Sequence, residues 1–197
     1  MLTHKGTPLL RTPRLGLRRF STDDAQAVYD SYTSDENVAR YHNLAVHESV
    51  QDTMSMLREW VSQYENLEYY HWIIEYKSDI VGEINLFDIA DRQERCEIGY
   101  TIASKWWNHG FATEAVCEVI RFAFSEINFN KIYARHDTEN IGSGRVMLKN
   151  GMKQEGLFRE HNMRQDGTRS DIAFYAAIKS EWVKGRAASD SVQEGNP

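Results

Sequence analysis

Apolar residues alternate with polar ones, or recur at helical spacing, along most of the chain. The first alternation, Arg14 to Phe20, predicts a half-buried strand. Ser21-Thr22-Asp23-Asp24 follows as a cap with acidic residues in the first turn, so we expect a helix that ends at about Tyr32. A second helix is predicted from about Glu48 to Tyr64, because its apolar residues are spaced to share one helix face.

The middle of the chain contains a predicted hairpin, a strand and a helix. Tyr70 to Tyr76 and Ile80 to Phe87 flank the short polar turn Lys77-Ser78-Asp79, which favours two antiparallel strands. Cys96 to Ala103 predicts another strand, and Gly110 to Ile127 carries the apolar stripe of an amphipathic helix.

The last third repeats this alternation of strand and helix. We expect a strand from Lys131 to His136, a shorter helix from Asn140 to Asn150, and strands near Met152 to Glu160 and Ile172 to Lys179. Together the elements predict an α+β (or α/β) fold, with a mixed, largely antiparallel sheet of about seven strands and helices on both faces.

Composition favours one globular domain, since 41% of the 197 residues are hydrophobic and 26% are charged. We expect this domain to cover residues 1–182, because residues 183–197 are small and polar without periodicity and indicate a disordered tail. The net charge of −6 argues against binding to nucleic acid and mildly favours a cationic partner. No apolar run has the length of a signal-peptide core or a membrane span, so we expect a cytoplasmic protein without membrane association.

Metal binding is not expected, because the histidines show neither HxxxH nor HExxH spacing and the two cysteines form no CxxC pair. The histidines are His4, His42, His47, His71, His109, His136 and His161.

The most informative segment is the tight turn from Trp107 to Ala115, between a predicted strand and a predicted helix. A helix N-terminus offers unpaired N–H groups and the positive end of the helix dipole, which suit a pyrophosphate. Gly110 allows a phosphate to approach the backbone closely, and Ala112 keeps the second contact small. On these residues alone, an ordinary strand-to-helix connection remains the alternative.

Further short motifs stand in order along the chain with this turn. They are Thr12-Pro13-Arg14-Leu15, Val81-Gly82-Glu83-Ile84, Glu97-Ile98-Gly99-Tyr100, Gly110-Phe111-Ala112-Thr113-Glu114-Ala115, Asn140 with Ser143, Lys149-Asn150-Gly151-Met152, and Glu155-Gly156. The series resembles the GNAT superfamily of acyl-CoA-dependent N-acetyltransferases, and more closely its RimJ/RimL-like branch, which acetylates protein N-termini. The resemblance spans roughly Thr12 to Trp182 and implies the GNAT-like acyl-CoA N-acyltransferase fold with acetyl-CoA as the donor.

The resemblance also implies where acetyl-CoA binds. The strand from Glu97 to Ala103 would splay from its neighbour and leave main-chain groups of Tyr100, Thr101 and Ile102 to pair with the pantetheine arm and thioester. Asn108 tolerates the left-handed conformation that the following turn needs. Backbone N–H groups would hold the pyrophosphate at His109, Gly110, Phe111, Ala112 and Thr113.

The proton-transfer groups also come from the resemblance. Glu97 is the expected general base, directly or through water, with an exposed strand glutamate as the alternative and Glu83 and Glu155 as fallbacks. Many members place a tyrosine acid where this chain has Met147, so water or Ser143 would serve the leaving thiolate.

Two residues at the start of the helix from Asn140 to Asn150 complete the expected site. By resemblance Asn140 would contact the pantetheine amide, with helix capping as the alternative. Ser143 would reach the sulfur or a phosphate from the same helix face.

The acceptor expected is the α-amine of a protein or peptide, which titrates at about 7.7 to 8.0 and needs a weaker base than a lysine near 10.4. The alternatives are a small-molecule amine (polyamine, amino acid or aminoglycoside) and a non-catalytic acyl-CoA-binding regulatory protein, the latter suggested by Met147. Tyr41 and His42 lie in the segment that shapes the acceptor pocket in the family. They would either contact the acceptor or only cover the core. A homodimer is the family default, although no exposed apolar stripe predicts one.

Overall fold

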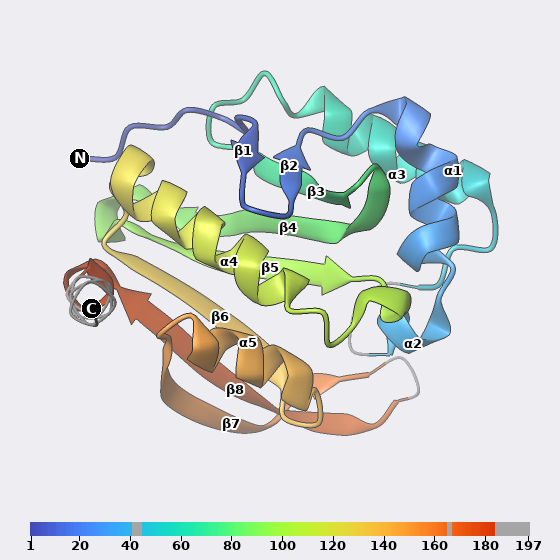
Figure 1. The fold of residues 1–197 in the computed structure, drawn as a ribbon. Coiled ribbons are helices and arrows are strands. Elements are labelled where there is room, and N and C mark those ends of the chain that lie inside the picture. Colours follow the sequence, from blue (N-terminus) through green and yellow to red (C-terminus); the bar gives the residue numbers. More distant parts are fainter. Residues whose placement is uncertain (41–44, 165–166, 184–197) are drawn as a thin grey trace, which may run out of the picture.

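The computed structural model describes residues 1–40, 45–164 and 167–183, and it builds them around one eight-stranded sheet. The spatial order of the strands is β1-β2-β3-β4-β5-β6-β8-β7 (Figure 1). Only β5 and β6 run parallel to each other, and all other neighbours are antiparallel. The strands are β1 (Leu10–Arg11), β2 (Gly16–Arg18), β3 (Tyr70–Tyr76), β4 (Asp79–Ala90), β5 (Arg95–Ile102), β6 (Lys131–Asp137), β7 (Lys153–Met163) and β8 (Arg169–Ile178).

Four of the five labelled helices in the described ranges fall on expected helical segments, and the helix at Glu36–Ala39 is the exception. They are α1 (Ala25–Val28), α2 (Glu36–Ala39), α3 (Val50–Ser62), α4 (Phe111–Phe122) and α5 (Ile141–Lys149). Two of them continue as a single π-helical turn, α1 through Tyr29–Thr33 and α4 through Ala123–Ile127, and short 3-10 turns occupy Thr22–Asp24, Asp91–Gln93 and Ser104–Trp106.

Two elements were not expected. β1 has two residues, too few for an alternation to be recognised, and it raises the strand number from about seven to eight. The four-residue helix α2 is capped by the Asp35 side chain, which accepts a hydrogen bond from the Asn37 N–H.

Helices cover both faces of the sheet, as the sequence predicts. Figure 1 shows α4 and α5 lying across one face. Trp72 and Ile74 of β3 belong to the core beneath α4, whereas Ile73 joins Leu57 of α3 and Val28 of α1 in a second core. This division follows from the alternation of side chains along a strand.

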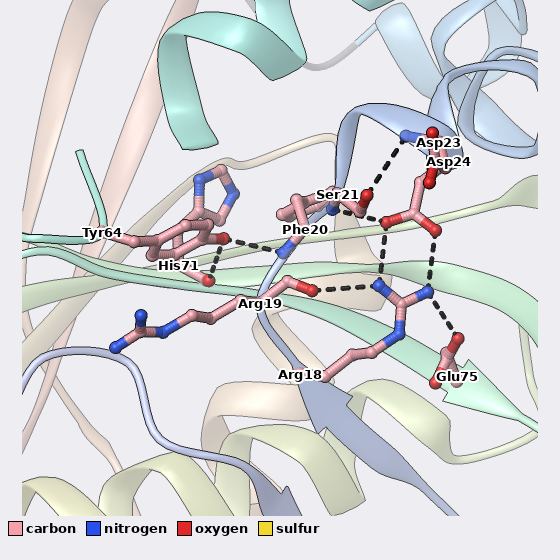
Figure 2. Close-up of polar contacts among 9 residues, drawn as sticks. All are labelled: Arg18, Arg19, Phe20, Ser21, Asp23, Asp24, Tyr64, His71 and Glu75. Carbon is pink, nitrogen blue, oxygen red and sulfur yellow. Dashed lines mark hydrogen bonds and ion pairs between the residues drawn. The ribbon is translucent and has the colours of Figure 1, made fainter. Parts of the chain in front are cut away.

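Polar contacts fix the corner between β2 and the first helix (Figure 2). The Arg18 guanidinium donates to both carboxylate oxygens of Asp24 at 2.8 Å and to Glu75 of β3 at 2.7 Å. Asp24 also accepts a 2.7 Å hydrogen bond from the Ser21 N–H, which completes the expected cap. Arg18 therefore ties the helix to the sheet through two carboxylates.

The Tyr64 hydroxyl, also in Figure 2, contacts the chain between β2 and the first helix. It accepts a 2.9 Å hydrogen bond from the Phe20 N–H and donates at 2.8 Å to the His71 carbonyl oxygen. Burial raises the pKa of Tyr64 to about 12, so its neutral form is favoured in the folded protein.

No helix in the three described ranges is long and apolar enough to cross a membrane. Most of the tail expected over residues 183–197 lies outside the described residues, as do Tyr41 and His42.

Candidate active site

The parallel strands β5 and β6 separate after a short stretch of pairing. Their register joins Arg95 to Lys131, Cys96 to Ile132 and Glu97 to Tyr133, and within the described chain it continues no further. The expected splay after Glu97 is thus present. A cavity of about 340 Å³ occupies the opening, with walls from β4, β5, β6, α5, β7 and β8.

Every second residue of β5 directs its main-chain N–H and C=O groups into this opening. The Ala103 N–H donates to the Val81 carbonyl at 2.9 Å, so the main-chain groups of Ala103 point toward β4. Because every second residue of a strand directs its N–H and C=O to the same side, the main chain of Thr101 also points toward β4. Tyr100 and Ile102 face the gap instead, and the Ile102 carbonyl accepts a 2.8 Å hydrogen bond from the Trp107 indole. Of the three residues predicted to present main-chain groups to the pantetheine arm, Thr101 is turned away.

The turn before α4 contains the left-handed backbone at Asn108 that the sequence allows. Asn108 (φ 64°) and Gly110 (φ +78°) are left-handed, and α4 begins at Phe111. The space over Gly110 is open, since a Cβ there would meet only the Arg14 guanidinium, at 3.4 Å, within 4 Å. The first turn of α4 therefore presents its N–H groups beside an uncovered glycine, which fits a phosphate group.

Glu97 lies where the two strands part and lines the cavity. Glu97 as a residue is only 5% exposed, which rules out the alternative of an exposed strand glutamate. Burial raises its pKa above the usual value, and the Arg135 guanidinium, whose Nε lies 3.0 Å from Oε1, opposes the rise only in part. The result is a buried carboxylate of raised basicity that faces the cavity.

The two fallback carboxylates lie elsewhere and do not line this cavity among the described residues. Glu83 is bound by His71 Nε2 at 3.1 Å and by the Tyr32 hydroxyl at 3.2 Å, on the face beneath α1 and α3. Glu155 is exposed on β7 and forms a 2.6 Å ion pair with Lys131.

The start of α5 forms the opposite wall. Asn140 Oδ1 accepts a 3.2 Å hydrogen bond from the Ser143 N–H, so Asn140 does cap the helix, and both residues also line the cavity. The Tyr100 hydroxyl donates to the Ser143 carbonyl at 3.0 Å and bridges β5 to α5. Met147, at the usual tyrosine position, is buried in the same wall.

Several residues that line the cavity were not predicted from the sequence. His136 Nδ1 donates to the Asp137 carbonyl at 2.8 Å, while its buried Nε2 has no partner among the described residues. The alternation of side chains along β6 could have indicated that His136 points inward, because it places His136 on the same face as the buried Ala134. His161 and Asn162 reach the cavity through a bulge in β7 between Phe158 and Asn162, which no local pattern announces.

One group outside the cavity has metal-ligand character in the described ranges. Ligand atoms of His4, Glu68 and Asp91 lie within 4.8 Å of one another near the surface. His4 also contacts the Tyr70 hydroxyl at 2.9 Å and Asp91 at 3.3 Å, so ordinary side-chain hydrogen bonds account for its placement.

Known proteins are similar to this chain in sequence and fold. Residues 14–153 match the acetyltransferase (GNAT) domain family. The uncharacterized N-acetyltransferase YoaA of Bacillus subtilis (strain 168) is 34% identical over 174 residues, covering 87% of this chain and 97% of that protein. The [ribosomal protein uS5]-alanine N-acetyltransferase of Escherichia coli (strain K12) is 25% identical over 189 residues, with coverage of 90% and 94%. The solved structure of the microcin C7 self immunity acetyltransferase MccE, in complex with acetyl-CoA and AMP, superposes with a TM-score of 0.76 at 18% identity, covering 85% and 93%.

Proposed function

Because the chain belongs to the GNAT family and is an acetyl-CoA-dependent N-acetyltransferase, we propose that its acceptor is the N-terminal α-amine of a protein or peptide. The observation that carries the proposal is the buried carboxylate of Glu97 at the parting of β5 and β6. The relative that acetylates the alanine of ribosomal protein uS5 supports the same acceptor class.

The strength of the base bears directly on the acceptor. At pH 7.5 about a quarter of an α-amine of pKa about 8 is neutral, compared with about 0.1% of a lysine amine. The raised pKa of Glu97 makes it a better base than an exposed glutamate, while Arg135 favours its ionised form. A carboxylate of this kind suits an amine that arrives partly neutral, and it suits lysine or polyamine amines poorly.

Acetyl-CoA, when bound, supplies an activated acetyl thioester. This chain would hold it through main-chain groups at the edge of β5, the amide of Asn140 and the uncovered N–H groups before and within the first turn of α4. The proposed binding residues are Tyr100, Ile102, Asn140 and Ser143, with Asn108, His109, Gly110, Phe111, Ala112 and Thr113 forming the turn.

In the proposal, the two side chains of the cavity that exchange protons with the reactants are Glu97 and Ser143. Glu97 accepts the proton of the attacking amine, directly or through water, and Arg135 stabilises the carboxylate before this transfer. Met147 has no proton to donate, so the Ser143 hydroxyl or water serves the leaving thiolate from α5. Direct attack requires no covalent intermediate on the protein.

The test is thiol release from acetyl-CoA with matched acceptors. Two peptides of identical sequence, each with an internal lysine, would differ only in a free or formylated N-terminus, and spermidine and an aminoglycoside would represent small amines. Release with the free N-terminus alone supports the proposal. Equal release with both peptides indicates lysine acetylation, and release with small amines alone assigns a different acceptor.

Binding is tested on the same sample. A ligand that binds only the folded state raises the melting temperature, so saturating acetyl-CoA should produce a clear shift. Absence of a shift would contradict the phosphate site at Gly110.

A further inference from the structure

The motif Thr12-Pro13-Arg14-Leu15 has no role in the proposed reaction, yet it packs against the first turn of α4. The Thr12 hydroxyl and the Arg14 N–H both donate to Glu114 Oε1, at 2.5 Å and 2.9 Å. Arg14 Nε donates to Glu114 Oε2 at 2.6 Å. The segment between β1 and β2 is thereby fastened to the helix that opens the phosphate site.

The guanidinium of Arg14 extends from this attachment onto the turn itself. Nη1 donates to the His109 carbonyl at 3.0 Å, and the planar group lies 4.7 Å from the centroid of the Phe111 ring. Nη2 lies 3.4 Å from the position that a Cβ on Gly110 would occupy. Nε and Nη1 are thus committed to the protein, whereas Nη2 borders the open space over Gly110.

The positive guanidinium of Arg14 lies beside the positive end of the α4 dipole, which is an unusual placement. A helix N-terminus carries a partial positive charge, so a guanidinium beside it is disfavoured unless anions compensate. Glu114 supplies one anion: although burial alone would raise its pKa, hydrogen bonds from Thr12 and Arg14 lower it below the usual value. The N–H groups of the first turn and Nη2 together still present donors to a second anion.

We propose that Arg14 is a cofactor-binding residue that donates a charged hydrogen bond from Nη2 to the pyrophosphate of acetyl-CoA. Its other two nitrogens position the turn by holding the His109 carbonyl and the Glu114 carboxylate. The inference rests on the proposed phosphate site at Gly110 and adds to it a side chain from the N-terminal segment. Held by an ion pair, a carbonyl and an aromatic ring, the guanidinium is ordered before the ligand binds, which reduces the entropic cost of binding.

The rival role for Arg14 is purely structural, as a clamp on the turn. Ligands that carry or lack the pyrophosphate are used to separate the two roles. Isothermal titration would use CoA, dephospho-CoA, which lacks only the 3′-phosphate, and pantetheine, which lacks the pyrophosphate and nucleotide. The variants are Arg14→Gln and Arg14→Lys.

The matched control variant is Arg18→Gln. It removes a neighbouring arginine that also holds two carboxylates but lies on the corner of β2 and α1, away from the phosphate site. Melting temperatures without ligand would report how far each substitution affects folding.

For Arg14→Gln we expect roughly a 10-fold or greater loss of affinity for both CoA and dephospho-CoA, the size typical of a charged hydrogen bond, with pantetheine binding unchanged. Arg14→Lys keeps the positive charge but lacks the several N–H donors of a guanidinium, so its affinity for CoA and dephospho-CoA should lie between those of Arg14→Gln and the wild type. Arg18→Gln should lower the melting temperature and leave CoA affinity intact.

Three results would overturn the proposal. Equal losses for all three ligands would reduce Arg14 to a structural clamp, and a loss confined to CoA would move it to the 3′-phosphate. Unchanged affinities in both Arg14 variants would remove it from the site. If Arg14→Gln does not fold, the same comparison in Arg14→Lys decides. A wild-type protein that binds no CoA would instead defeat the phosphate site itself.

Discussion

Replacing Glu97 by glutamine removes a negative charge from the cavity while keeping nearly the same volume. Glutamine cannot accept the proton of the amine, and a general base typically contributes about 10²- to 10⁴-fold to the rate. We therefore expect kcat/KM for the peptide to fall by about this factor, equivalent to about 2.7 to 5.4 kcal/mol of transition-state stabilisation. The affinity for acetyl-CoA should not change.

The same substitution should leave the folded state intact. Because burial raises the pKa of Glu97 above its value in the unfolded chain, its stabilising contribution is present at acidic pH and is lost as the pH rises through the folded pKa. Above the folded pKa, the folded protein bears the cost of a buried charge that glutamine avoids. Arg135 loses the negative charge of its partner, but glutamine keeps an acceptor oxygen and the Arg135 side chain is 48% exposed and remains hydrated. We expect an unchanged or slightly higher melting temperature at pH 7.

Thiol release and thermal unfolding on one preparation test both halves of this reasoning. Glu155→Gln is the matched control, since it neutralises a glutamate that is exposed and paired with Lys131 outside the cavity, and it should change neither measurement. Wild-type turnover in Glu97→Gln would refute the role of Glu97 as the base. A fall of several degrees in its melting temperature would refute the electrostatic argument.

Three further predictions follow from the same geometry. Ser143→Ala should lower kcat with little effect on KM for acetyl-CoA, measured by steady-state thiol release, and intact turnover would remove Ser143 from the mechanism. Gly110→Ala places a side chain at φ +78° against Arg14, so it should lower the melting temperature by about 2 to 8 °C, from a cost of about 1 to 2 kcal/mol, and weaken the shift caused by acetyl-CoA. The pKa of about 12 for Tyr64 implies stability that is present below pH 10 and lost between about pH 10 and 12. Urea unfolding across this range should show a smaller loss for Tyr64→Phe than for the wild type, and equal losses would contradict the assignment.

Local pattern was sufficient for the elements with many periodic residues. The spacing of apolar side chains predicts α3 and α4, because each helix must bury one face. The polar turn after Tyr76 predicts the hairpin of β3 and β4. The left-handed backbone of Asn108 was likewise accessible, since asparagine tolerates this conformation better than other non-glycine residues.

The expectation that Glu97 stands in the active site came from the resemblance, and the surroundings of its carboxylate came only from the fold. Arg135 lies 38 positions away along the chain, and the parallel pairing of β5 with β6 brings it to Glu97. The same pairing ends after Glu97 and opens the cavity, while Thr101 turns toward β4 because of its place in the ladder.

The sequence by itself determined the order of the longer elements, the cap at Ser21 and the position of the turn before α4, because these depend on neighbours within a few residues. Only the tertiary structure decided which side chains meet. Arg14 reaches Glu114 across 100 positions, and a bulge in β7 brings His161 and Asn162 to the cavity. Such contacts depend on strand order, register and the divergence of two strands, which are set by the packing of the whole sheet rather than by any local run of residues.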